Sequence, residues 1–192
     1  TEIYTLSLHD ALPICNKLLA QMTDDVASLV LNDNYQQSQS LSVWETRAAS
    51  QLGIHAEFIR DLEKAGLMRR QLEGLPDKET IARMTRDGLG LTRPELCTLL
   101  AYAKLTLFSD IMKSGVPDDA DLTASLMDYF PQALQKYGIE IQTHKLRREI
   151  VATQLANEIV NRMGPVFVRS RILKAGASAG EVAKAYAVIV EA

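Results

Sequence analysis

The chain has 192 residues and a formal net charge of −3, with 47% hydrophobic and 23% charged residues. This apolar content is sufficient for a folded core and argues against an intrinsically disordered chain. The near-neutral charge argues against a nucleic-acid partner bound through a basic surface, and no apolar run approaches the ~18 residues of a membrane span. The composition is typical of a cytoplasmic protein with no membrane partner.

Residues 1–14 read TEIYTLSLHDALPI. Charged and polar residues at Glu2, His9 and Asp10 interrupt the apolar positions, so this segment is not a secretory signal peptide. The string resembles the conceptual translation of a short-read sequencing adapter. We therefore expect residues 1–14 to be non-native and to pack poorly, and we expect a coding sequence truncated at both ends.

The remainder is predicted to be almost entirely helical, beginning with a helix from near Thr23 toward Ser40. A second helix is predicted over about 43–65, opened by a capping box in which the Ser42 hydroxyl and the Glu45 carboxylate satisfy free backbone N–H groups. We expect Gly66 to end this helix. Its apolar stripe, at steps of four and three, comprises Ala48, Leu52, His55, Ile59 and Leu62.

Asp77 is expected to cap a short helix that ends near residue 86. The strongest apolar period follows over 93–113, behind a second capping box at Thr92 and Glu95. The other predicted helices cover 122–130, a turn over 131–137, a long segment over 143–163, a short one over 166–173, and the end of the chain from 179, behind a third capping box at Ser178 and Glu181.

No segment alternates apolar and polar residues between turn signals, so no β-strand is predicted. The fold class is therefore all-α, a bundle-like arrangement of about eight helices without a sheet. There is no repeat of fixed period and no low-complexity linker.

The usual signals of catalytic or cofactor chemistry are weak in this sequence. The one glycine-dense stretch, Gly88–Gly90, has Arg93 at the third fingerprint position and no preceding strand, which leaves dinucleotide binding unsupported. His55 lies on an apolar stripe and is predicted to be a hydrogen-bonded core histidine. Cys97 is expected to be a small buried hydrophobe rather than a nucleophile. We predict no catalytic, cofactor-binding or metal-binding residue.

One helix carries an unusual polar stripe. Arg147, Gln154, Asn157 and Asn161 follow one another at steps of seven, three and four, within the predicted helix over 143–163. Buried amides need hydrogen-bonding partners, so such a stripe favours one register of contact. It indicates either an interdomain or subunit contact or a solvated helix face, and the sequence leaves both open. Amides alone supply no acid, base or nucleophile.

Several long runs resemble the C-terminal part of bacterial large NAD-specific glutamate dehydrogenases. They are NKLLAQMTD over 16–24, the polar segment 33–39, LTRPELCTLLAYAKL over 91–105 and HKLRREIVATQLANEIVNRMGPVFV over 144–168. The resemblance covers essentially all of 15–192, and its departures are small: Cys15, Cys97, Thr98 and Val166.

The resemblance implies that the parent enzyme oxidises L-glutamate to 2-oxoglutarate and ammonia with NAD as cofactor. The family's catalytic lysine and aspartate and its nicotinamide-binding fold lie upstream of this segment, so no catalytic residue is transferred. By resemblance, residues 15–41 are the last helices of the dehydrogenase core and 42–192 are a C-terminal helical domain. Its expected partners are the remaining domains and other subunits of a homo-oligomer. The alternative is a stand-alone helical protein-interaction module.

Overall fold

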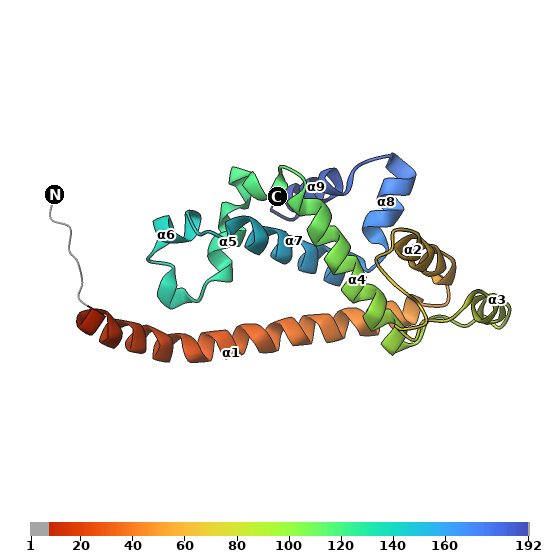
Figure 1. Ribbon diagram of the computed structural model, residues 1–192, viewed down its shortest axis with the longest axis horizontal. Helices are drawn as coiled ribbons and strands as arrows, with labels where there is room; N and C mark the ends of the chain where they lie inside the picture. The colour runs from red at the N-terminus through yellow and green to blue at the C-terminus, as the bar shows by residue number, and fades with distance from the viewer. Residues whose placement is uncertain (1–7, 192) are drawn as a thin grey trace.

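The computed structural model describes residues 8–191, apart from the side chains of 8–12, 121, 123–125 and 191. Within these residues it contains α-helices and short 3-10 helices but no β-strand, which confirms the all-α prediction (Figure 1). The α-helices are α1 (Leu8–Arg47), α2 (Leu52–Lys64), α3 (Lys78–Arg86), α4 (Arg93–Met112), α5 (Thr123–Tyr129), α6 (Gly138–Gln142), α7 (Arg147–Met163), α8 (Phe167–Ala175) and α9 (Ala179–Glu191). The 3-10 helices are η1 (Val116–Asp118), η2 (Ala120–Leu122) and η3 (Gln132–Leu134).

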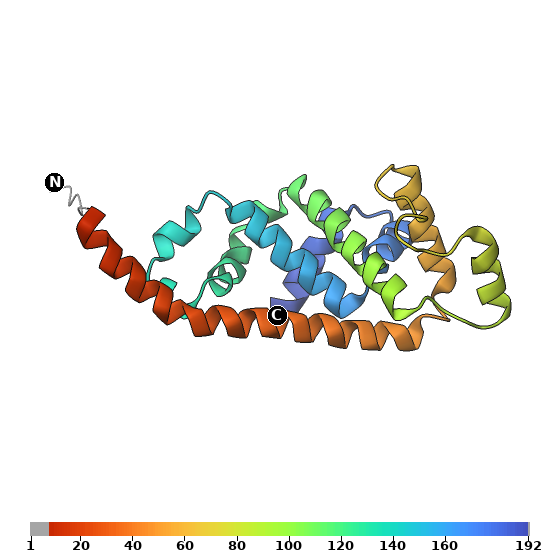
Figure 2. The same ribbon diagram turned by 60° about the horizontal axis from the view of Figure 1, so that its bottom comes forward.

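Helices α4 and α7 form the centre of the molecule and pack more extensively against each other than any other pair in the described chain. Their facing sides are apolar and fully buried, for example at Leu96 and Leu99 on α4 and Ile159 on α7. Burial of each such side chain stabilises the fold by about 1.5–3 kcal/mol. Helices α1, α5 and α9 surround this pair, and α1 runs along one side of the molecule (Figure 2).

Helix α1 is one continuous helix of 40 residues, so the predicted helix start at Ser42 is wrong. Leu41 and Trp44 are both buried on either side of that position, which keeps this part of the chain helical against the core. The Ser42 hydroxyl donates to the carbonyl oxygen of Ser38, one turn back, as serine does within helices. The chain leaves the helix only at 48–51, before α2.

The long helix predicted over 143–163 is also wrong at its start, because α7 begins only at Arg147. Helix α6 ends at Gln142, and the Thr143 hydroxyl donates back to the Ile139 carbonyl. The His144 ring then folds against Phe130, with ring centroids 5.7 Å apart, and its Nδ1 accepts from the Leu146 backbone N–H. These local contacts hold residues 143–146 in a turn.

Other predicted helix ends are confirmed. The Asp77 side chain accepts from the Thr80 N–H at the start of α3. The Thr92 N–H donates to Glu95 Oε2 at 2.6 Å and opens α4, while the Ser178 N–H donates to Glu181 Oε2 at 2.7 Å and opens α9. Gly66, with φ of 69°, directly follows the last residues of α2.

Residues 1–7 of the segment expected to be non-native lie outside the described residues, and 8–14 form the first turns of α1. Pro13 and Ile14 are the residues of that segment whose side chains are described, and both are exposed. The origin of the segment and the division at 41/42 stay predictions. Among the described helices, none combines the length and the apolar character needed to cross a bilayer.

Candidate interdomain contact site

The C-terminal half of α7 lies beside α1 (Figures 1 and 2). Three of the four predicted contact residues lie together there in a polar groove. Gln154, Asn157 and Asn161 are half-buried on the same side of α7, as their spacing predicts. The groove has a volume of about 380 Å³. We call it the polar groove; it is lined by Asp33, Asn34, Gln36 and Gln37 of α1, Lys104 of α4, Asp128 of α5, and Gln154, Asn157, Glu158, Asn161 and Arg162 of α7.

Arg147 does not belong to the polar groove. Because α7 begins at Arg147, this residue lies about 10 Å along the helix axis from Gln154. Its guanidinium instead pairs with Asp118 of η1 at 3.0 Å, and Arg148 also pairs with Asp118. The two arginines therefore link the start of α7 to η1, in the segment that follows α4.

The α1, α4 and α5 side of the groove was not identified as a site from the sequence. The available signal was the run Asp33–Ser40, which contains Tyr35 as its only apolar or aromatic residue within a helix that is otherwise rich in apolar positions. A helix that presents a long polar segment to another helix indicates a polar interface. Lys104 could not be found this way, because it lies on an apolar helix far away in the sequence.

Charged side chains line the polar groove in a mixed pattern. Lys104 Nζ donates to Gln37 Oε1 at 2.8 Å and joins α4 to α1, and partial burial lowers the pKa of this lysine while the nearby Asp33 carboxylate opposes that shift. On α7, Arg162 pairs with Glu158 at 3.3 Å. The cations of the groove are thus already engaged, whereas Asp128 has no ion pair among the described residues.

Two amide oxygens in the groove are buried without hydrogen-bond partners in the described part of the chain, Gln154 Oε1 and Asn161 Oδ1. An unpaired buried acceptor costs about 1–3 kcal/mol, so a partner that brings N–H or O–H donors gains more than it would at an ordinary surface. The groove residues supply no nucleophile next to a base. Chemically, the arrangement is suited to recognition rather than to bond making.

One end of the groove is anchored by a buried hydrogen-bond chain between α1 and α7. Ser40 Oγ donates to the Asn161 carbonyl oxygen at 2.6 Å and accepts from Trp44 Nε1 at 3.1 Å. The Trp44 ring lies against Gly164, where a Cβ atom would come within 2.7 Å of the ring carbons. A side chain at 164 would therefore push the end of α7 away from α1, and the groove would open.

His55 and Cys97 differ from their predicted environments. His55 is fully buried as predicted, but neither ring nitrogen has a hydrogen-bond partner among the described residues, and burial lowers its pKa to about 4. Cys97 is exposed, not buried, because one step along a helix turns it about 100° away from the buried Leu96. No group of three or more potential metal ligands occurs in the described residues.

A family model described as "Glutamate dehydrogenase, C-terminal" matches residues 88–192. The chain is 44% identical to the NAD-specific glutamate dehydrogenase of Halomonas elongata over 174 residues, which are 90% of this chain and 11% of that protein. The proteins of the same name from Pseudomonas aeruginosa and Mycobacterium tuberculosis are 43% and 42% identical over 91% and 79% of this chain, and 11% and 9% of their own lengths.

The chain therefore spans only a small part of the length of these relatives, whereas the similarity extends over most of the chain itself. The matched family region contains α4, α7, α8 and α9, which include the α7 side of the polar groove. The chain belongs to the glutamate dehydrogenase family, as part of the C-terminal region of the bacterial NAD-specific enzymes.

Proposed function

We propose that this chain is part of an enzyme that oxidises L-glutamate to 2-oxoglutarate and ammonia and transfers the hydride to NAD. The name of the relatives, NAD-specific glutamate dehydrogenase, supports this activity for the whole protein. In this proposal, NAD and glutamate bind elsewhere in the enzyme. The described segment contributes contacts to the remaining domains of the chain or to neighbouring subunits of a homo-oligomer.

The observation that carries this role is the polar groove with its two unpaired buried amide oxygens, Gln154 Oε1 and Asn161 Oδ1. A surface built only to face water leaves its amides solvated, whereas these two oxygens are buried. Donor groups from another part of the enzyme that reach these oxygens as the groove side chains rearrange would recover their desolvation cost. The Asp128 carboxylate, which has no ion pair among the described residues, favours a partner side chain that is cationic, such as lysine or arginine.

The part of α1 before Asp33 adds independent support. Leu19, Val26 and Val30 follow at steps of seven and four, which places them on one face of the helix, and all three are exposed. An apolar stripe of this kind is normally covered in the assembled protein. The chain covers only 11% of the length of two of its relatives, so the same polypeptide of those proteins is long enough to supply such a covering region.

The proposal is tested with Asn157→Arg in the complete enzyme that contains this segment. Asn157 lines the groove and has no hydrogen bond within the described residues, so the change is expected to leave the unfolding temperature of the 192-residue chain nearly unchanged. In the complete enzyme, the bulk and charge should displace the partner. We expect a lower rate of NADH production and a smaller assembly in analytical ultracentrifugation.

Thr153→Arg is the matched control, since Thr153 lies on the same helix but is exposed and outside the groove. It should change neither activity nor assembly. If Asn157→Arg behaves like Thr153→Arg in the complete enzyme, the groove is a solvated face and the contact proposal is wrong. NADH production by the purified 192-residue chain with L-glutamate and NAD would contradict the non-catalytic role.

A further inference from the structure

An apolar groove lies along helices α8 and α9, which pack against each other, and it shares only Arg162 with the polar groove. We call it the α8–α9 groove; its volume is about 780 Å³. Val182 and Tyr186 of α9 lie deep in it and are each 9% exposed, whereas Ile189 lies at its edge and is 75% exposed. Phe167 of α8 completes the apolar lining. A concave apolar surface of this size marks a binding site.

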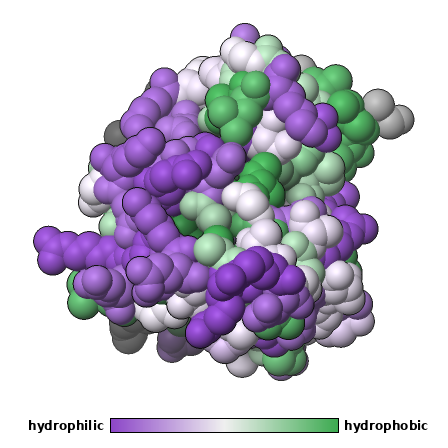
Figure 3. Space-filling view, turned by 90° about the vertical axis from the view of Figure 1, so that its right-hand side faces the viewer, coloured by the Kyte–Doolittle hydropathy of each residue, from purple (hydrophilic) through white to green (hydrophobic). Residues whose placement is uncertain are grey.

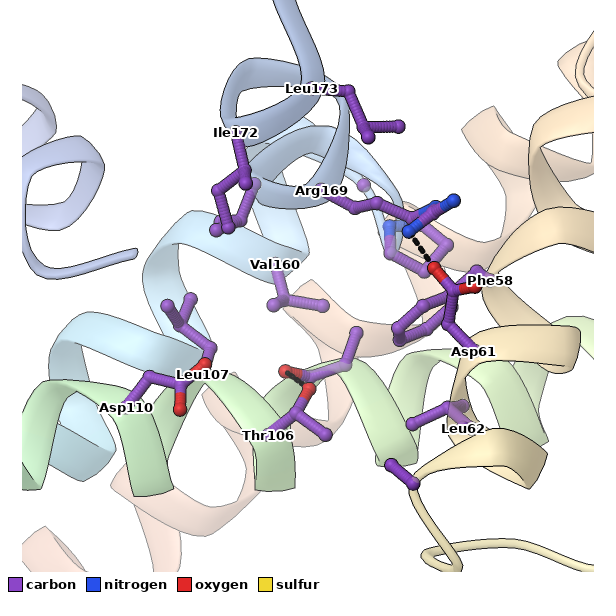
Figure 4. Close-up of a pocket in the computed structure, with 15 residues that line it drawn as sticks. Phe58, Asp61, Leu62, Thr106, Leu107, Asp110, Val160, Arg169, Ile172 and Leu173 are labelled. Atoms are coloured by element: carbon purple, nitrogen blue, oxygen red, sulfur yellow. Dashed lines mark hydrogen bonds and ion pairs between the residues drawn. The ribbon is translucent and has the colours of Figure 1, made fainter. Parts of the chain in front are cut away.

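Helix α8 has one side toward the core and the other toward this groove. Figure 4 shows the inner side, where Arg169 is joined to Asp61 of α2 and Ile172 lines a cavity of about 250 Å³ between α2, α4, the end of α7 and α8. Phe167 and Arg171 follow one turn apart on the opposite side of the helix and line the groove. At this end of the molecule, apolar patches at the surface alternate with charged side chains (Figure 3). The ion pair beneath α8 therefore holds the groove in a fixed orientation.

One charged side chain of the groove is available to a partner. The Arg171 guanidinium lies over the Phe167 ring, 5.1 Å from its centroid, and has no ion pair or hydrogen bond among the described residues. The other charged lining residues, Arg162 and Glu181, are already engaged within the chain. A partner that brings a carboxylate to Arg171 therefore complements the charge of the groove, whereas a cation is repelled.

The lining of the groove favours a helix as its occupant. No lining residue has a buried unpaired polar atom, and the described chain has no strand whose edge could pair with an extended peptide. An extended peptide would lose water from its N–H and C=O groups without gaining hydrogen bonds, whereas a helix bonds these groups internally. A flat lipid surface is disfavoured because Val182 and Tyr186 lie deep in the groove.

We propose that the α8–α9 groove binds one amphipathic helix from another part of the same enzyme, with apolar side chains against Phe167 and Tyr186 and a carboxylate beside Arg171. Val182, Tyr186 and Ile189 follow at steps of four and three, so the groove runs along about two turns of α9. A partner helix fills that length with apolar residues at the same spacing. The inference rests on the proposed function in one respect, that the chain is part of a longer enzyme. It covers 11% of two relatives, which are long enough to supply such a helix.

The test places the photo-crosslinker p-benzoylphenylalanine at position 189 of the purified complete enzyme and identifies the captured peptide by mass spectrometry. We expect one segment from outside these 192 residues, with apolar residues at steps of three and four and an aspartate or glutamate among them. The same crosslinker at Val188, which is exposed on α9 outside the groove, should capture much less of it. Capture of no peptide, of a segment without this pattern, or of residues 8–191 of a second copy would overturn the proposal.

Arg171→Glu tests the charge pairing. It should lower the crosslinking yield at position 189 about two- to fivefold, the worth of a surface ion pair, and changing the captured acid to arginine should restore the yield. Lys174→Glu is the matched control, since Lys174 is exposed on α8 and does not line the groove. Equal losses in the two variants would overturn the role of Arg171.

The two docking proposals fail separately. If Asn157→Arg leaves activity and assembly unchanged while position 189 captures the expected helix, the polar-groove contact is wrong and the α8–α9 groove proposal stands. The reverse pair of results would overturn only the α8–α9 groove proposal.

Discussion

The part of α1 before Asp33 and helix α7 are both amphipathic. The first is exposed, whereas the second packs against other helices on two sides. Almost every described residue of α1 before Ser40 is exposed, including Leu31 at 69%. On α7, by contrast, Ile159 is 0% exposed, and the helix has neighbours on its apolar face (α4) and on its polar face (α1). A helix can therefore form in this chain without being part of the core.

The two regions differ in the interactions that stabilise their helical state. The helical state of the part of α1 before Asp33 rests mainly on local backbone hydrogen bonds, which are marginal for isolated helices. That of α7 rests on burial, hydrogen bonds and ion pairs to several elements. We therefore expect the part of α1 before Asp33 to depend on a covering partner, while α7 belongs to the unit that folds cooperatively.

The largest expected effect is the loss of core packing in α7. Ile159→Ala leaves a cavity against α4 and should lower the free energy of unfolding by about 2–5 kcal/mol. Leu31→Ala removes a side chain of similar size from the exposed part of α1 and should change the free energy of unfolding by less than about 0.5 kcal/mol. Urea unfolding followed by circular dichroism measures both. Comparable losses for the two variants would contradict the distinction drawn between the regions.

The next effect is a pH dependence of the free energy of unfolding, which arises from the buried His55 in the packed region. The pKa of His55 is lowered to about 4 in the folded chain, from 6.5 when exposed, so the unfolded chain binds the proton first as the pH falls. Stability is therefore lost between about pH 6.5 and pH 4, and the full difference is on the order of 3 kcal/mol. The measurement is the free energy of unfolding across this range.

His55→Leu removes the titrating group while keeping an apolar side chain in the space. This variant should lose the pH dependence between about 6.5 and 4 that wild type shows. It should also be at least as stable at neutral pH, because both buried ring nitrogens lack partners in the described residues. A variant with the same pH profile as wild type would show that His55 does not titrate in this range.

The smallest effect concerns the point where the two regions join. Ser40→Ala leaves the Trp44 Nε1–H and the Asn161 carbonyl without the hydroxyl that bridges them, and should cost about 1–3 kcal/mol. Ser42→Ala, two residues further along the same helix and exposed, should cost less than about 0.5 kcal/mol. Trp44 is the only tryptophan, so its fluorescence reports unfolding at this junction. Equal effects would mean that the bridge contributes nothing to stability.

Local signals were sufficient for much of the fold. The predicted starts of α3, α4 and α9 are confirmed because a side-chain cap acts on the backbone within three residues and needs no tertiary partner. The stripe of Leu52, His55, Ile59 and Leu62 is buried as its period predicts. The side shared by Gln154, Asn157 and Asn161 likewise follows from helical spacing.

The errors share a physical cause. Ser42 has the sequence of a helix start, but burial of Leu41 and Trp44 against other elements keeps the helix intact through it. Residues 143–146 have a helical period, but contacts among Phe130, His144 and Leu146 hold them in a turn. In both cases, contacts with other elements outweigh the local preference for a helix cap at Ser42 or for helix over 143–146, which is worth about 1 kcal/mol.

The sequence by itself determined the all-α class, most helix boundaries, the family, and the stripe of amides on α7, because each depends on residue type and helical period. The tertiary structure alone decided what faces that stripe. Asp33 and Gln37 of α1, Lys104 of α4 and Asp128 of α5 meet Gln154 and Asn157 only through packing between helices far apart in the chain. For the same reason, only the structure brings Arg169 above the cavity between α2 and α4.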